Sequence, residues 1–232
     1  MRVLVLTSCT DKKAVETDVP LTADDLDDPS RLAAGEGRLH TLLRPAGVMY
    51  TGKQHVRAMH GVQAMRTELG TAGVVVAIIS AGYGVVDENR LIAPYDVTFS
   101  GMSATAIRAR GARLGIPAAA RNVLPGHDVV FQLLGSDYLT SLAPPLVPSG
   151  DQRLVCFAKP GEMRIASTSV AIPAGSAEAG RWGAGNIALK GRMLELIGEA
   201  VRRDGTQVLE RIKADPTPST IMEILDHEAK RT

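Results

Sequence analysis

Hydroxyls, a thiol and lysines directly follow the first apolar segment of the chain. That segment is Val3–Leu6, and the polar run after it has the sequence TSCTDKK. In an open α/β sheet, ligands bind beyond the carboxyl ends of the strands. Hydroxyls, ammonium groups and backbone N–H groups at such a position can hold an anion or a polar ligand. We therefore expect Ser8, Cys9 and Lys12 at a binding site. A simple strand-to-loop turn with solvated lysines is the alternative.

A glycine turn with one aromatic residue follows a second apolar segment. Val74–Ile79 leads into Ser80–Gly84, with the sequence SAGYG. The glycines permit positive φ and close approach of a ligand to the backbone. Tyr83 can stack on a planar ligand. The turn is no dinucleotide fingerprint, because a third glycine and the opening of a helix are missing. A purely structural glycine turn is the alternative.

A carboxylate lies on a rigid segment slightly further along the chain. Pro94 biases the residue before it towards extended backbone, and Tyr95 and Asp96 follow it. A carboxylate held rigidly beside tyrosines can act as a general base or stabilise a developing cation. Asp87 lies in the same connection and competes for that catalytic role. A turn or cap role is the alternative for Asp96.

Basic residues in three places are candidates for phosphate contacts. Lys53 and Arg57 share one face of a helix that follows the Tyr-Thr-Gly sequence at Tyr50. Arg108 belongs to a second cluster, and a third pair, Lys190 and Arg192, lies near the C-terminus. A solvated helix face is the alternative for each of them. The histidines lack the spacing of metal ligands, and we expect neither a metal nor a cofactor.

Strands and helices alternate along the part of the chain that carries these motifs. Unbroken apolar runs of strand length are typical of strands covered on both faces, as in a parallel sheet. Between the apolar runs, Gln54–Leu69 and Ser103–Leu114 carry apolar residues at helical spacing, which predicts two connecting helices. The pattern predicts an α/β fold with one mostly parallel sheet flanked by helices on both faces. The four predicted strands are Val3–Leu6, Val74–Ile79, Val129–Leu134 and Leu154–Ala158.

The chain divides into two predicted units. Residues 1–172 form the α/β core with the active pocket, and residues 186–232 form a C-terminal helical appendage. The appendage contains predicted helices at Ile187–Arg203, Gly205–Ala214 and Pro218–Ala229. On the first of these helices, Ile187, Leu194, Ile197 and Val201 are expected to face inward. The basic residues expected to stay exposed are Lys190, Arg192, Arg202 and Arg203.

Bulk properties limit the class of protein. The 232 residues carry 45% hydrophobic side chains, which is typical of a globular chain, and a net charge of +1. Nucleic-acid binding must therefore come from a local basic patch. Cys9 and Cys156 lie far apart, which argues against a disulfide scaffold or a zinc site. No apolar run approaches the roughly 20 residues of a membrane span. We expect a soluble cytoplasmic protein with no membrane partner, of open oligomeric state.

The motifs, taken in order, resemble a bacterial and phage family of uncharacterised domains related to YaaA. The resemblance covers roughly residues 1–138 and includes Ser-Cys, the lysines, Tyr-Thr-Gly, Ser-Ala-Gly-Tyr-Gly and Pro-Tyr-Asp. It implies a compact α/β fold and an association with nucleic acids and modified bases, including base exchange or removal. The site residues that it implies are Ser8, Cys9, Lys12, Tyr50, Ser80, Tyr83, Gly84, Tyr95 and Asp96, with Ser8 a candidate catalytic residue.

Cleavage of an N-glycosidic bond is the chemistry that fits these residues. It needs a pocket for an extruded base, aromatic stacking and a carboxylate that faces the sugar. Tyr83 and Tyr95 are the candidates for stacking, and Asp96 is the candidate carboxylate. The leading hypothesis is a DNA glycosylase, or a related base-processing enzyme, acting on modified DNA. The family resemblance adds the expectation of a role in anti-phage defence. The alternatives are a non-catalytic nucleic-acid-binding protein and an enzyme of free nucleosides or nucleotides. Ser8, Lys12, Ser80, Tyr83 and Asp96 should converge on one concave site.

Overall fold

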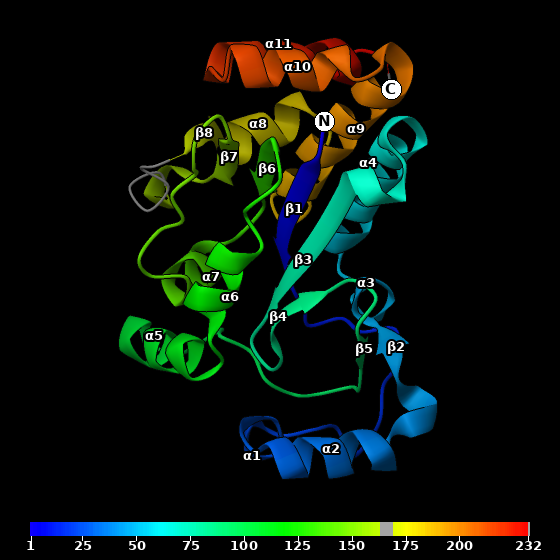
Figure 1. Cartoon of the computed structure of the whole chain (residues 1–232), viewed down its shortest axis with the longest axis vertical. Coiled ribbons are helices and arrows are strands. Elements are labelled where there is room, and N and C mark those ends of the chain that lie inside the picture. The colour runs from blue at the N-terminus through cyan, green and yellow to red at the C-terminus, as the bar shows by residue number, and fades with distance from the viewer. Residues whose placement is uncertain (163–168, 232) are drawn as a thin grey trace.

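A mostly parallel sheet forms the centre of the protein (Figure 1). The structure is a computed structural model that describes residues 1–162 and 169–231. Within those residues the main sheet has six strands in the order β4-β3-β1-β6-β7-β8, and only β4 runs antiparallel to its neighbour. The strands are β1 (Val3–Ser8), β3 (Val74–Ser80), β4 (Gly84–Asp87), β6 (Val129–Gln132), β7 (Arg153–Ala158) and β8 (Val170–Pro173). The predicted α/β class with one mostly parallel sheet is confirmed.

The four predicted strands are β3, β1, β6 and β7, adjacent and parallel to one another. Every residue of β1 and β6 is buried, as expected for strands covered on both faces. Val3 of β1 is in register with Val74 on one side and Val129 on the other, so the strands start level. Consequently the loops that follow them emerge at one edge of the sheet, which is where a parallel sheet places its ligands.

Two long helices, α4 (Lys53–Leu69) and α9 (Leu189–Asp204), pack against each other with their backbones almost in contact. A Cβ atom added to Gly191 would lie 2.2 Å from the carbonyl oxygen of Gln54, and one added to Gly198 would lie 2.3 Å from that of Gly61. Only glycine permits such an approach. These glycines are therefore what fixes α9 on α4.

The C-terminal helices share the hydrophobic core of the sheet. Leu189, Leu194 and Leu225 are fully buried in the same cluster of apolar side chains as Val3 and Phe131. The predicted division between a core at 1–172 and an appendage at 186–232 is therefore not a boundary in the packing. The first of the two predicted ranges also includes 163–168, which lie outside the described residues.

Shorter elements surround the sheet, and α1 and α2 lie at the opposite end of the molecule from α10 and α11 (Figure 1). Ser103 caps α5, with its hydroxyl accepting from the Ala106 N–H at 3.2 Å. None of the helices in the described ranges is both long and apolar enough to cross a membrane. The remaining helices are α1 (Ala23–Asp27), α2 (Pro29–Arg38), α3 (Ala46–Met49), α5 (Ala104–Arg113), α6 (Ile116–Asn122), α7 (Ser136–Ser141), α8 (Ser176–Arg181), α10 (Gln207–Ala214) and α11 (Pro218–Ala229). Single 3₁₀ turns occur at His40–Leu42, Thr71–Gly73 and Pro160–Glu162, and β2 (Arg44–Pro45) pairs with β5 (Leu91–Ile92) in a small antiparallel sheet.

Candidate functional site

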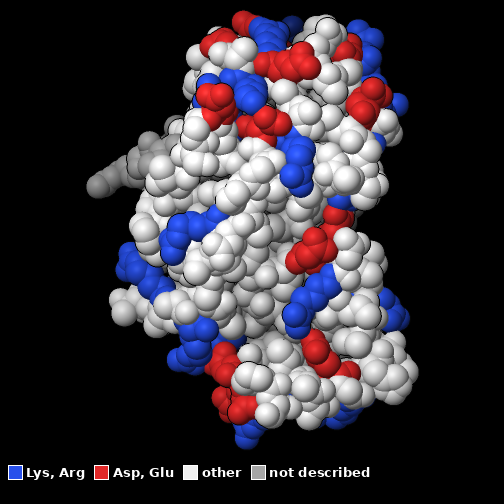
Figure 2. All heavy atoms as spheres, in the orientation of Figure 1, with Lys and Arg blue, Asp and Glu red and all other residues white. Residues whose placement is uncertain are grey.

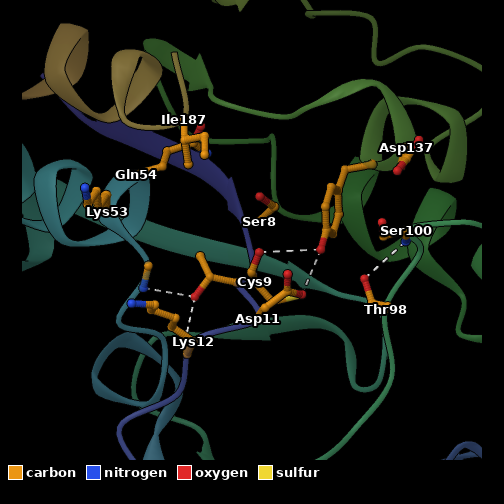
Figure 3. Close-up of a pocket in the computed structure, with 13 residues that line it drawn as sticks. Ser8, Cys9, Asp11, Lys12, Lys53, Gln54, Thr98, Ser100, Asp137 and Ile187 are labelled. Carbon is orange, nitrogen blue, oxygen red and sulfur yellow. Dashed lines mark hydrogen bonds between the residues drawn. The ribbon is translucent and has the colours of Figure 1, made fainter. Parts of the chain in front are cut away.

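An open pocket of about 450 Å³ lies at the carboxyl end of β1 (Figure 3). Its walls come from the loop after β1, the start of α4, the segment before α5, and α7. The volume is in the range of small-molecule sites and would accommodate a mononucleotide. The residues that line it are Ser8, Cys9, Thr10, Asp11, Lys12, Gly52, Lys53, Gln54, Thr98, Ser100, Asp137, Tyr138 and Ile187.

The two lysines of the pocket lie on the same side of it, near the start of α4 (Figure 3). Figure 3 shows Lys12 and Lys53 on one side of the pocket, with Thr98, Ser100 and Asp137 on the other. Among the described residues, neither lysine side chain has an ion-pair or hydrogen-bond partner. The positive end of the α4 dipole lies at the same place. This side of the pocket is therefore suited to an anionic group.

Hydrogen bonds fix the lysine-bearing loop to the start of α4. The Gly52 N–H donates to the Thr10 hydroxyl oxygen at 3.1 Å, and that hydroxyl donates to the Lys12 carbonyl at 2.8 Å. The Thr51 N–H donates to the same carbonyl at 3.0 Å. Gly52 has no room for a side chain, because an added Cβ would lie 2.7 Å from Thr10. These hydrogen bonds thus hold the backbone of Lys12 next to the first residue of α4, Lys53.

Two carboxylates face the pocket, and sequence reasoning did not identify either of them. Asp11 is exposed beside Cys9, and Asp137 is partly buried in the first turn of α7. Within the described part of the chain, neither carboxylate makes a hydrogen bond or an ion pair. Both are therefore available to a ligand or to a water molecule.

Cys9 and Tyr138 form the floor of the pocket. The Cys9 Sγ lies 3.0 Å from the Tyr138 hydroxyl, which also donates to the Cys9 carbonyl at 3.4 Å. Burial, reinforced by the nearby thiol, raises the pKa of Tyr138 above its ordinary value, so the phenol stays protonated at neutral pH. Phe99 supports the tyrosine ring edge-on at 5.3 Å. Tyr138 is therefore a rigid, neutral aromatic wall.

A buried tyrosine and serine network lies behind the pocket. The Tyr95 hydroxyl is 2.8 Å from the Ser80 hydroxyl and 3.0 Å from the Tyr50 hydroxyl. The Gly82 N–H donates to the Ser80 hydroxyl, and Gly84 has the positive φ expected of this turn. Burial raises the pKa of both Tyr50 and Tyr95. These predicted ligand-binding residues do not line the pocket; instead they hold together the loops that form it.

The predicted convergence of five residues is correct only for Ser8 and Lys12. Tyr83 is half-buried outside the pocket, where its hydroxyl accepts from the Ala93 N–H at 3.0 Å. Asp96 is exposed and absent from the pocket wall, because its N–H pairs with the Leu21 carbonyl and Tyr95 takes the inward position. Asp87 is exposed at the end of β4 and bonds within its own turn. Neither carboxylate occupies its predicted catalytic position.

Most of the predicted phosphate ligands already have carboxylate partners. Glu195 forms ion pairs with Arg57 at 2.5 Å and with Arg192 at 3.0 Å. Lys190 is only 4% exposed and pairs with Glu162 at 2.7 Å. The predicted exposure of Lys190 and Arg192 is therefore wrong, because Lys190 is directed to the buried Glu162 and Arg192 to the partly buried Glu195. Arg108 is exposed on α5, away from the pocket, and Lys53 alone of the five predicted phosphate ligands lines it.

Ile187 was expected to pack inward and is 80% exposed at the rim of the pocket, because it precedes the first residue of α9. Asp137 and Tyr138 were missed, although they had a usable signal. They lie three and four positions after the end of the apolar run Val129–Leu134, much as Ser8 follows the first strand. The same strand-end rule would have found them.

Comparisons with protein-family models, with curated proteins and with solved structures found no match for this chain. Among the described residues, no group of three or more histidine, cysteine, aspartate or glutamate side chains is placed to hold a metal ion. Fold and site together define an α/β protein with a pocket at the carboxyl edge of its sheet, with lysines on one side and two carboxylates that have no partner among the described residues.

Proposed function

We propose that the protein hydrolyses the N-glycosidic bond of a nucleotide held in the pocket, and that a free nucleotide is its substrate. The observation that supports this most strongly is the pair of lysines beside the start of α4, Lys12 and Lys53, which have no carboxylate partner in the described part of the chain. A phosphate group fits this arrangement by charge and by hydrogen bonding. The sugar would then extend towards Asp137 and Tyr138.

In this proposal Asp137 takes the catalytic role that was predicted for Asp96. Hydrolysis joins a water oxygen to the anomeric carbon while the carbon–nitrogen bond breaks, and the bond electrons leave with the base, which takes up a proton. The products are a sugar phosphate and a free base. A carboxylate near the anomeric carbon stabilises the cationic transition state or accepts the proton of the attacking water. Asp137 is partly buried, lines the pocket and has no hydrogen-bond partner among the described residues.

A long DNA substrate has less support from the molecular surface. Figure 2 shows lysines and arginines interspersed with aspartates and glutamates on the face viewed, and largely uncharged residues over its centre. Arg57 and Arg192, which were candidates for DNA phosphates, are paired with Glu195. Salt-dependent DNA binding relies on cations that are free to replace counterions. A DNA glycosylase would use the same chemistry in the same pocket and is the second outcome that the experiment must separate.

The experiment is a product assay on two substrate panels. Purified protein is incubated with 5′-mononucleotides and, separately, with DNA duplexes carrying natural base modifications, and free bases are measured by mass spectrometry. We expect base release from at least one mononucleotide and loss of that release in Asp137→Asn. Release from DNA alone would restore the glycosylase hypothesis. No free base from either panel would overturn N-glycosidic hydrolysis.

A further inference from the structure

A second cavity, of about 260 Å³, adjoins the pocket along the carboxyl edge of the sheet. It lies beyond the ends of β6 and β7, whereas the first pocket lies beyond β1. The two cavities share four lining residues, Gln54, Asp137, Tyr138 and Ile187. The residues that line only the second cavity are Gly135, Ser136, Lys159, Glu162, Asn186 and Lys190.

A buried ion pair lines this second cavity. Lys190 and Glu162 are 4% and 5% exposed, and their charged atoms are 2.7 Å apart. The Lys190 ammonium also donates to the Leu134 carbonyl, and Glu162 Oε2 also accepts from the Lys159 N–H at 2.8 Å. Among the described residues, the other carboxylate oxygen, Oε1, has no hydrogen-bond partner. One acceptor therefore remains beside a buried cation.

A buried ion pair of this kind usually contributes little to the stability of a protein core. Removing two charges from water usually costs as much as their attraction returns, so a buried ion pair is weak evidence of a stabilising role. Its position on a cavity wall gives it a different use. A carboxylate oxygen accepts from an N–H group, and an ammonium group donates to a carbonyl or ring nitrogen. The polar edge of a nucleobase carries an N–H group next to a carbonyl or ring nitrogen, so it can pair with both groups.

We propose that the second cavity is the base-binding subsite of the nucleotide and that Glu162 and Lys190 recognise the polar edge of the base. This inference rests on the proposed function. With the phosphate at Lys12 and Lys53 and the base at Glu162, the sugar lies at the junction of the cavities, where Asp137 belongs to both walls. The ligand class is a nucleobase that carries an N–H donor next to an acceptor.

The first test separates recognition of the base from recognition of the phosphate. Binding constants are measured for GMP, AMP and purine riboside 5′-phosphate, whose base has no N–H donor on its polar edge. We expect purine riboside 5′-phosphate to bind at least ~10-fold more weakly than the better of the other two, because it offers no donor to the Oε1 atom of Glu162. Glu162→Gln should reduce the difference in affinity between purine riboside 5′-phosphate and the better of the other two nucleotides. Lys53→Gln should weaken the binding of all three nucleotides by a similar factor. Glu195→Gln is the matched control, since Glu195 also pairs with basic residues but lines neither cavity.

A second variant tests the subsite without disturbing the buried pair. Ser136 is exposed and lines only the second cavity, so Ser136→Phe should fill it. This variant should lose nucleotide binding and keep the affinity of the wild type for ribose 5-phosphate, which has no base. Equal losses for both ligands, or unchanged selectivity in Glu162→Gln, would overturn the subsite and leave the ion pair structural. Binding of nucleotides without any base release would instead contradict the proposed function alone.

Discussion

Replacing Gly191 by alanine should force α4 and α9 apart. The added methyl carbon would lie 2.2 Å from the Gln54 carbonyl oxygen and 3.0 Å from its carbon, whereas real Cβ atoms essentially never come closer than 3.0 Å. The contact between the added methyl carbon and the Gln54 carbonyl oxygen must therefore lengthen by at least 0.8 Å, from 2.2 Å to the 3.0 Å limit, and the two helices must shift to allow it. Overpacking of this kind costs up to about 3 kcal/mol, and the better helix propensity of alanine returns about 1 kcal/mol. The net loss of stability is therefore expected to reach up to about 2 kcal/mol.

Urea denaturation measures this loss, and thermal unfolding should show it as a decrease in Tm of about 4–8 °C for a chain of this size. Gly37→Ala is the control, because Gly37 lies in α2 with nothing within 4 Å of an added Cβ. It should be neutral or stabilising by up to about 1 kcal/mol. Ligand affinity should also fall in Gly191→Ala, since Gln54 lies at the junction of the two cavities. A Gly191→Ala protein as stable as the wild type would refute the close contact of the two helices.

Three further changes test the site and its support. Lys12→Gln should raise the KM for a nucleotide by about 10-fold or more with little change for the nucleoside, because a charge-assisted contact to phosphate is lost; equal effects on both substrates would contradict a phosphate role. Asp137→Asn should lower kcat about 10²-fold, whereas Asp96→Asn should leave kcat unchanged. Steady-state kinetics on both variants measures this, and a larger loss of kcat in Asp96→Asn would contradict the assignment. Burial lowers the pKa of His55 below its ordinary 6.5. The unfolded chain therefore binds that proton first as pH falls, and stability decreases below about pH 6.5. His55→Gln should flatten this part of the stability–pH curve in urea denaturation, and an unchanged slope would assign it to other groups.

The sheet was predictable from the sequence because its signal is local. Apart from Gln132, each of the four runs is apolar without alternation, and burial on both faces favours that composition. The strand-end rule then placed Ser8, Cys9 and Lys12 at the pocket, as the structure has them. Lys53 also lies there, because α4 begins beside the loop after β1.

The rest of the site depends on contacts between distant parts of the chain. Tyr50, Ser80 and Tyr95 have the types of ligand-binding residues, but their hydroxyls satisfy one another in the core. Lys190 has the type of a surface residue, yet it finds a carboxylate in Glu162, 28 positions away. Helical periodicity alone carries no information about such partners.

Formation of a free base is the measurement that tests the central claim most directly. The wild type and Asp137→Asn are incubated with the mononucleotide that binds best, in water enriched in ¹⁸O, and both products are followed by mass spectrometry. We predict equal amounts of free base and of sugar phosphate labelled with one ¹⁸O atom at the anomeric carbon, with formation about 10²-fold slower in the variant. Slow exchange of oxygen in the free sugar is corrected with a ribose 5-phosphate standard. A tightly bound nucleotide that is recovered intact from both proteins would contradict the account and favour a binding protein.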